Sequence, residues 1–144
     1  MADERVLRRQ ELKIDCEDDV VVVRRAVRTV AQETGFDAFA TAAVTTAASE
    51  LARNVWTHAR RGVAVVEAIA NERREGVRMQ FRDEGPGIAD LDRALAGGYS
   101  TAKSLGLGLS GSKRLVDEFE IETTRGKGTV VTAVKWARFS SKIG

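Results

Sequence analysis

Apolar residues recur along this chain with two periods, one typical of helices and one typical of strands. Apolar positions three and four residues apart predict a first helix that ends at Gly35, with the Asp15 side chain capping its start. The same spacing predicts a second, alanine-rich helix that begins at Asp37 or Thr41 and ends near Ala59. A third helix is expected over residues 106–117.

Five segments of strand-like composition predict strands at residues 6–14, 63–70, 77–82, 119–124 and 129–136. A turn over residues 71–76 joins the second and third, and a hairpin loop over residues 125–128 joins the last two. Because strands adjoin in pairs and do not alternate with helices, the pattern favours an α+β fold over a doubly wound parallel sheet. We therefore expect a mixed, mostly antiparallel sheet with helices packed on one face.

Length and composition narrow the class of protein. A chain of 144 residues, 43% hydrophobic and 31% charged, predicts one soluble domain over residues 1–144. A net charge of +2 without a long Lys/Arg run argues against a nucleic-acid partner. The longest aliphatic run, residues 20–23, is too short to span a membrane, and a lone Cys16 without a signal peptide predicts a cytoplasmic location. Neither Cys16 nor the only histidine, His58, has sequence neighbours that would complete a catalytic or metal site.

Two polar residues of the second helix are candidates for a functional site. Glu50 and Asn54 are four positions apart, so they project from one face of the helix. Such a pair is usually a solvated surface, but the neighbours Ala47, Leu51 and Val55 indicate a mostly buried helix, in which polar groups need partners. A metal–phosphate complex would supply them: an amide oxygen suits Mg²⁺, and a carboxylate beside the terminal phosphate could accept a proton.

Two glycine-containing stretches are further candidates. Asp83-x-Gly85-x-Gly87 is either an ordinary turn or a loop in which Asp83 accepts a hydrogen bond from an exocyclic amino group and Gly87 passes a flat base. Gly106-x-Gly108-x-x-Gly111 formally matches a dinucleotide-binding fingerprint, but no strand precedes it directly and no acidic residue lies at the required distance. It is either a flexible turn or a helix start whose backbone N–H groups bind phosphate.

These motifs, with Gly126-x-Gly128-Thr129 as a fourth, resemble those of the GHKL ATPase superfamily over nearly the entire chain. The resemblance implies the Bergerat two-layer sandwich, with ATP or ADP and Mg²⁺ as cofactors. It implies that Asn54 coordinates Mg²⁺ and that Glu50 is the general base. The residues implied in adenine binding are Asp83, Gly85, Gly87 and Thr129, and those implied near the phosphates are Lys103, Gly106, Leu107, Gly108 and Leu109.

The implied ATP lid covers about residues 90–105, and Ser104 stands where many relatives have another glycine. No dimerisation helix with a phospho-acceptor histidine precedes Glu50, so the chain does not resemble a complete histidine kinase. It is similar to the small bacterial serine/threonine kinases of partner-switching systems. Residues 45–54, 98–101, 113–119 and 135–136 favour the RsbT-type switch kinases of the stressosome over the anti-sigma kinases similar to RsbW and SpoIIAB.

This resemblance implies transfer of the ATP γ-phosphoryl group to a serine or threonine. The implied partners are STAS-domain proteins similar to RsbS and RsbR, and a PP2C-type phosphatase similar to RsbU that the released kinase activates. A homodimer is also possible. Two other functions stay open: an anti-sigma factor that binds ATP or ADP, and a non-catalytic module that uses ATP only to change shape.

Overall fold

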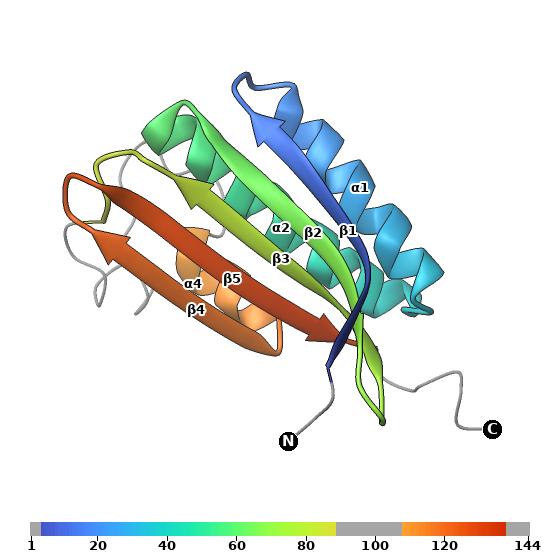
Figure 1. Cartoon of the computed structure of the whole chain (residues 1–144). Coiled ribbons are helices and arrows are strands. Elements are labelled where there is room, and N and C mark those ends of the chain that lie inside the picture. The colour runs from blue at the N-terminus through green and yellow to red at the C-terminus, as the bar shows by residue number, and fades with distance from the viewer. Residues whose placement is uncertain (1–3, 89–107, 138–144) are drawn as a thin grey trace.

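A computed structural model describes residues 4–88 and 108–137 of the chain (Figure 1). Its elements are β1 (Arg5–Ile14), α1 (Asp19–Glu33), α2 (Ala38–Ala59), β2 (Gly62–Ala70), β3 (Glu75–Asp83), α4 (Gly108–Leu115), β4 (Glu118–Thr124) and β5 (Gly128–Trp136). All five strands and the three helices expected from the sequence are therefore present. The predicted lid, with Lys103, Gly106 and Leu107, lies outside the described residues.

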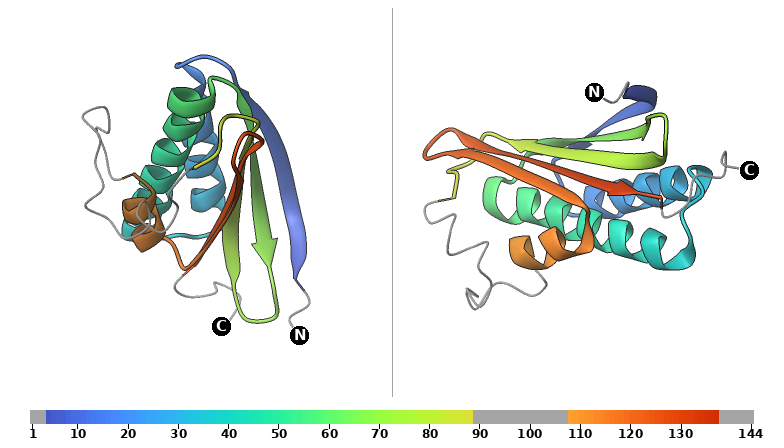
Figure 2. Two further views of the ribbon diagram at one scale, coloured as in Figure 1. Left: turned by 90° about the vertical axis from the view of Figure 1, so that its left-hand side faces the viewer. Right: turned by 90° about the horizontal axis from the view of Figure 1, so that it is seen from below.

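The strands form one sheet in the order β1-β2-β3-β5-β4. Each neighbouring pair in this sheet is antiparallel, and α1, α2 and α4 all lie on the same face of it (Figure 2). The predicted α+β fold is thus confirmed, and the described sheet has no parallel pair. The other face of the sheet carries no helix in the described part of the chain.

The hydrophobic core lies between the sheet and the helices. Its central element is α2, which buries a stripe of residues three and four positions apart: Ala40, Val44, Ala47, Ala48, Leu51, Ala52 and Val55. The strands contribute their inward-facing positions, including the fully buried Phe81 and Met79 of β3. No helix among the described residues is both long and apolar enough to cross a membrane.

The sequence predicted the start of α2 correctly but not the start of α1. Asp37 is the N-cap of α2, as expected, and its carboxylate accepts the Ala40 N–H at 2.7 Å. The prediction that Asp15 caps α1 is wrong, because a turn over residues 16–18 precedes the helix. Instead, the Asp19 carboxylate accepts the Asp15 backbone N–H at 3.0 Å, and this hydrogen bond lowers the pKa of Asp19.

The hairpin between β4 and β5 is one residue tighter than the sequence predicted. The Lys127 N–H donates to the Thr124 carbonyl at 2.9 Å, and Gly126 adopts a left-handed φ of 79° in the turn. Gly128 consequently belongs to β5 and pairs with Thr124, and Thr123 pairs with Thr129. A loop of four residues would have reversed which of the two threonines faces the helices.

Two phenylalanines provide a direct test of where the core lies. Phe81 is 1% exposed, whereas Phe39, at the start of α2, is 87% exposed. We expect Phe81→Ala to lower the free energy of unfolding by about 3–5 kcal/mol, because it leaves a cavity in the core. Phe39→Ala, the matched control, should change it by no more than about 0.5 kcal/mol. Equilibrium urea unfolding measures both, and equal losses would contradict this placement of the core.

Candidate functional site

The inner face of the sheet changes from apolar to polar in its last row of side chains. Asp83 of β3 pairs with Thr129 of β5, which in turn pairs with Thr123 of β4, so the three lie side by side across the sheet. The next inward row is apolar, and its members Phe81 and Val131 are buried in the core. The carboxylate and the two hydroxyl groups of this row thus lie at the edge of the core, where the loops begin.

The loop that follows β3 packs against the C-terminal end of α2. A Cβ atom added to Gly85 would lie 2.7 Å from the Ala59 Cβ, so only glycine fits there without a shift. The Gly85 N–H also donates to Asp83 Oδ1 at 2.9 Å, which orients this carboxylate. The loop therefore brings Asp83 to the end of the helix that carries Glu50 and Asn54.

Glu50 and Asn54 both lie half-buried on α2. The Glu50 side chain is 14% exposed, and its Oε2 accepts a hydrogen bond from Arg53 at 2.6 Å. Asn54 lies one turn further towards Ala59, about 6 Å along the helix axis at 1.5 Å per residue. Neither residue therefore lies on a fully solvated surface of the helix.

Two glycines allow the loop after β3 to pack directly on the β4–β5 hairpin. Gly87 has a φ of 79°, and an added Cβ would lie 2.7 Å from the Thr124 carbonyl oxygen. Gly128 has a φ of 130°, and an added Cβ would lie 2.0 Å from the Asp83 carbonyl oxygen. The Gly126 N–H also donates to the Pro86 carbonyl at 2.8 Å. The loop and the hairpin are thus joined backbone to backbone.

Thr123 is a site residue that the sequence predictions missed. Its Oγ1 lies 3.0 Å from Thr129 Oγ1, accepts the Ile88 N–H at 2.9 Å and lies 3.3 Å from the Gly128 carbonyl oxygen. It therefore links the loop after β3 to Thr129. The signal that could have found it is the hairpin register, because a loop of three residues places Thr123 opposite Thr129.

The helix α4 packs beside α2 (Figure 2). This helix begins at Gly108, whose φ of 65° favours glycine. Leu109 packs against the core, and the buried Ser112 hydroxyl donates to the Gly108 carbonyl at 2.9 Å. The structure thus places Gly108 and Leu109 at a helix start, as predicted, and the preceding glycine of the motif is not among the described residues.

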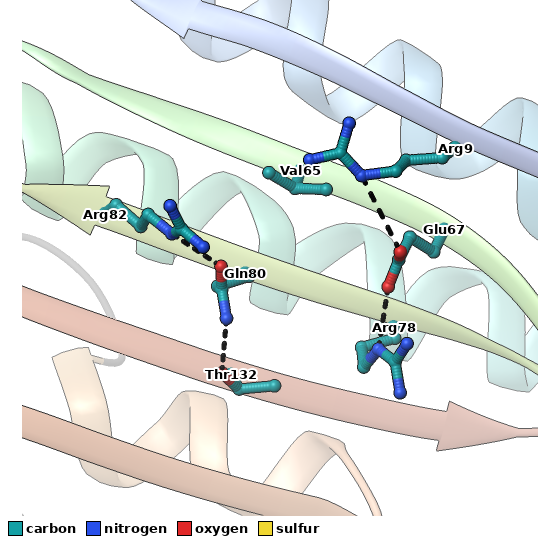
Figure 3. Close-up of a pocket in the computed structure, with 7 residues that line it drawn as sticks. All are labelled: Arg9, Val65, Glu67, Arg78, Gln80, Arg82 and Thr132. Atoms are coloured by element: carbon teal, nitrogen blue, oxygen red, sulfur yellow. Dashed lines mark hydrogen bonds and ion pairs between the residues drawn. The ribbon is translucent and has the colours of Figure 1, made fainter. Parts of the chain in front are cut away.

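A depression of about 360 Å³ lies on the opposite, helix-free face of the sheet (Figure 3). Its charges are largely paired, since Glu67 contacts Arg78 at 2.7 Å and Arg9 at 3.8 Å. Burial works to lower the pKa of Arg78, but its hydrogen bonds to Glu67 and Glu4 raise it above the ordinary value. The depression is lined by Arg9, Val65, Glu67, Arg78, Gln80, Arg82 and Thr132, none of them a predicted site residue.

Within the described ranges, one group of acidic and thiol side chains is close enough to share a metal ion. It consists of Asp15, Cys16 and Asp19, whose ligand atoms lie within 4.8 Å of one another at the start of α1. Asp15 and Cys16 are exposed. Exposed acidic groups commonly lie this close together without a metal ion. The group includes neither Glu50 nor Asn54, so it is separate from the predicted Mg²⁺ position.

Comparison with known proteins shows the family of the chain. The model of the histidine kinase-like ATPase domain family matches residues 12–135, a range that includes every polar residue described above on the inner face. The chain is 42% identical over 127 residues to the serine/threonine-protein kinase RsbT of Bacillus subtilis. That alignment covers 88% of this chain and 96% of RsbT.

More distant similarities extend to anti-sigma factors. The anti-sigma F factor of Caldanaerobacter subterraneus subsp. tengcongensis is 31% identical over 99 residues, which is 65% of this chain and 68% of that protein. The fold is similar to a crystal structure of the RsbU and RsbW domains of a Mycobacterium tuberculosis protein, with a TM-score of 0.61 and 21% identity. This match covers 92% of the chain but only 34% of the larger protein, and it concerns the fold alone.

The contact between Gly128 and Asp83 can be tested by adding one methyl group. We expect Gly128→Ala to destabilise the protein by about 3 kcal/mol or more, because a Cβ would collide with the Asp83 carbonyl and the positive φ would be strained. Gly126→Ala is the matched control, since its φ is also positive but its Cβ would meet no atom within 4 Å. Gly126→Ala should lower the free energy of unfolding, measured in urea, by about 1–2 kcal/mol. Equal costs would argue against the close approach.

Proposed function

Because this chain belongs to the histidine kinase-like ATPase domain family, we propose that it is an ATP-dependent serine/threonine protein kinase of a partner-switching module. The observation that carries the proposal is the similarity to RsbT over almost the full length of both proteins. In the proposed reaction, a serine or threonine hydroxyl of a STAS-domain partner attacks the γ-phosphorus of ATP. A new P–O bond forms to the hydroxyl oxygen, and the bond to the β-phosphate oxygen breaks.

The chemistry of the inner-face residues fits ATP and Mg²⁺. The half-buried Asn54 amide oxygen is a hard ligand that would hold Mg²⁺, which supplies charge neutralisation at the phosphates. The Asp83 carboxylate accepts hydrogen bonds only, so it would recognise the exocyclic amino group of adenine. Gly85 and Gly87 keep the neighbouring backbone free of side chains, and Thr129 would assist through a water molecule.

The phosphates would bind where α4 begins. Backbone N–H groups at a helix start are unpaired within the helix, and the helix dipole favours an anion there. In this proposal Gly108 and Leu109 contribute such groups, together with Gly106 and Leu107 of the preceding segment. Lys103 and the proposed lid over residues 90–105 would complete the phosphate site within one GHKL domain.

Glu50 is proposed as the general base. Its carboxylate would take the proton of the attacking hydroxyl, and Arg53, which donates to Oε2, would help to orient it. The half-buried position limits the rotation of this side chain and keeps it at the inner edge of α2. Most of the rate enhancement would come from positioning and charge neutralisation, and the base would contribute about 10²–10⁴-fold.

The proposed partners follow from the similarity to RsbT. We propose STAS-domain proteins similar to RsbS and RsbR as substrates and a PP2C-type phosphatase similar to RsbU as the target of the released kinase. A cytoplasmic location and a homodimer stay predictions from the sequence. A second candidate function, anti-sigma factor activity, is favoured by the similarity to the anti-sigma F factor.

Two substitutions on α2 separate the proposed roles. Glu50→Ala should keep ATP binding and lower phosphotransfer by about 10²–10⁴-fold, because only the base is removed. Asn54→Ala should instead weaken the Mg²⁺-dependent part of ATP binding. Calorimetry with and without Mg²⁺ measures binding, and transfer of labelled phosphate to a STAS protein measures activity. The exposed Glu72→Ala is the control, and full activity in Glu50→Ala would refute the assigned base.

The identity of the partner separates the two candidate functions. Affinity capture of the tagged chain from its host, followed by mass spectrometry, should recover STAS-domain proteins and a PP2C-type phosphatase. Incubation of the captured complex with ATP should then add 80 Da to a serine or threonine of the STAS protein, the mass of one phosphoryl group. Recovery of a sigma factor would support the anti-sigma function, and capture of STAS proteins without phosphorylation would support a non-catalytic module.

A further inference from the structure

We propose that Thr123 is a positioning residue of the nucleotide site. Its hydroxyl donates to the Thr129 oxygen and so orients the Thr129 hydroxyl. The Thr129 hydroxyl then donates a hydrogen bond to N1 of the adenine ring, directly or through one water molecule. Asp83, the neighbour of Thr129 in the sheet, accepts from the adjacent amino group. The inference rests on the proposed function, because it requires adenine to bind beside Asp83.

The distribution of protons in the threonine pair supports this assignment. A hydroxyl group has one proton, and Thr123 Oγ1 already accepts the Ile88 N–H at 2.9 Å. Its own proton can go to Thr129 Oγ1 at 3.0 Å or to the Gly128 carbonyl at 3.3 Å. The shorter distance is nearer the usual O–H···O range, so we assign the proton to the bond with Thr129. The Thr129 proton is then left to donate to a ligand.

The position of Thr129 prevents bulk water from replacing this arrangement. Thr129 is 8% exposed, and Thr123 beside it is half-buried. The donor that Thr123 accepts from belongs to the backbone of Ile88, in the loop that Gly85 and Gly87 pack against α2 and the hairpin. The chain of hydrogen bonds therefore starts at a fixed backbone group and ends at the Thr129 hydroxyl.

The hydrogen-bonding pattern of Asp83 and Thr129 matches adenine. On its Watson–Crick edge adenine presents an amino donor beside the N1 acceptor, whereas guanine and hypoxanthine present an oxygen acceptor beside an N1–H donor. The Asp83 carboxylate accepts and the Thr129 hydroxyl donates, so together they complement adenine, whereas the carboxylate would face the oxygen acceptor of the other two. Thr123 thereby contributes to the choice of nucleotide without touching it.

The test compares ATP with 1-deaza-ATP, which keeps the amino group but has carbon in place of N1. Wild type should prefer ATP by about 2- to 12-fold, the range expected for one net hydrogen bond. Thr123→Val removes the hydroxyl and should bring this ratio towards one, and Thr123→Ser should retain the wild-type ratio. Thr124→Val, on the exposed side of the same strand, is the matched control. Competition against a fluorescent nucleotide measures the affinity of wild type and of the three variants for both nucleotides.

The ratio distinguishes positioning from a general structural role. A loosened loop would weaken both nucleotides alike and leave the ratio unchanged, so an unchanged ratio in Thr123→Val overturns the inference. A ratio of one in wild type also overturns it but leaves the proposed kinase intact. Failure of wild type to bind ATP at all overturns both. Thr123→Ala provides the same comparison if Thr123→Val lacks a cooperative unfolding transition.

Discussion

The burial of one face of α2 against the sheet is the contact on which the rest of the structure depends. Its stripe of alanine, valine and leucine fills the space between the two layers and fixes the helix along the inner face of the sheet. Glu50 and Asn54 occupy the border of this stripe, so the packing of apolar neighbours sets their position. The same helix ends at Ala59, against which the loop after β3 folds. One apolar surface thus arranges polar groups of α2 and of the loop after β3.

The sequence predicted the elements and their class because each carries a regular apolar period. Asp37 was one of two candidate starts because it and Thr41 both lie before a clear helical pattern, and the structure shows Asp37 as the N-cap. Asp15 was misassigned because several acidic residues follow one another, and a turn among them selects Asp19 as the acceptor. Thr123 was missed because its orientation depends on whether the hairpin loop has three or four residues, which composition alone does not determine. Local pattern therefore predicts which elements form, and register decides which side chains meet.

The two faces of the sheet use polar residues in different ways. On the helix-free face, charged groups such as Glu67 and Arg78 pair with each other (Figure 3). On the inner face, Asp83 and Thr129 lie in the final row, where the strands meet the loops. Relatives with different names, a kinase and an anti-sigma factor, are similar to this chain in sequence.

The strand order also has a consequence for how the chain folds. The β2–β3 and β4–β5 pairs are hairpins between consecutive strands, so each closes a short loop. Pairing of β1 with β2, and of β3 with β5, instead joins strands that other elements separate in the sequence. Loop-closure entropy makes such non-local pairing slow. We therefore expect these two non-local pairings to form after the two hairpins.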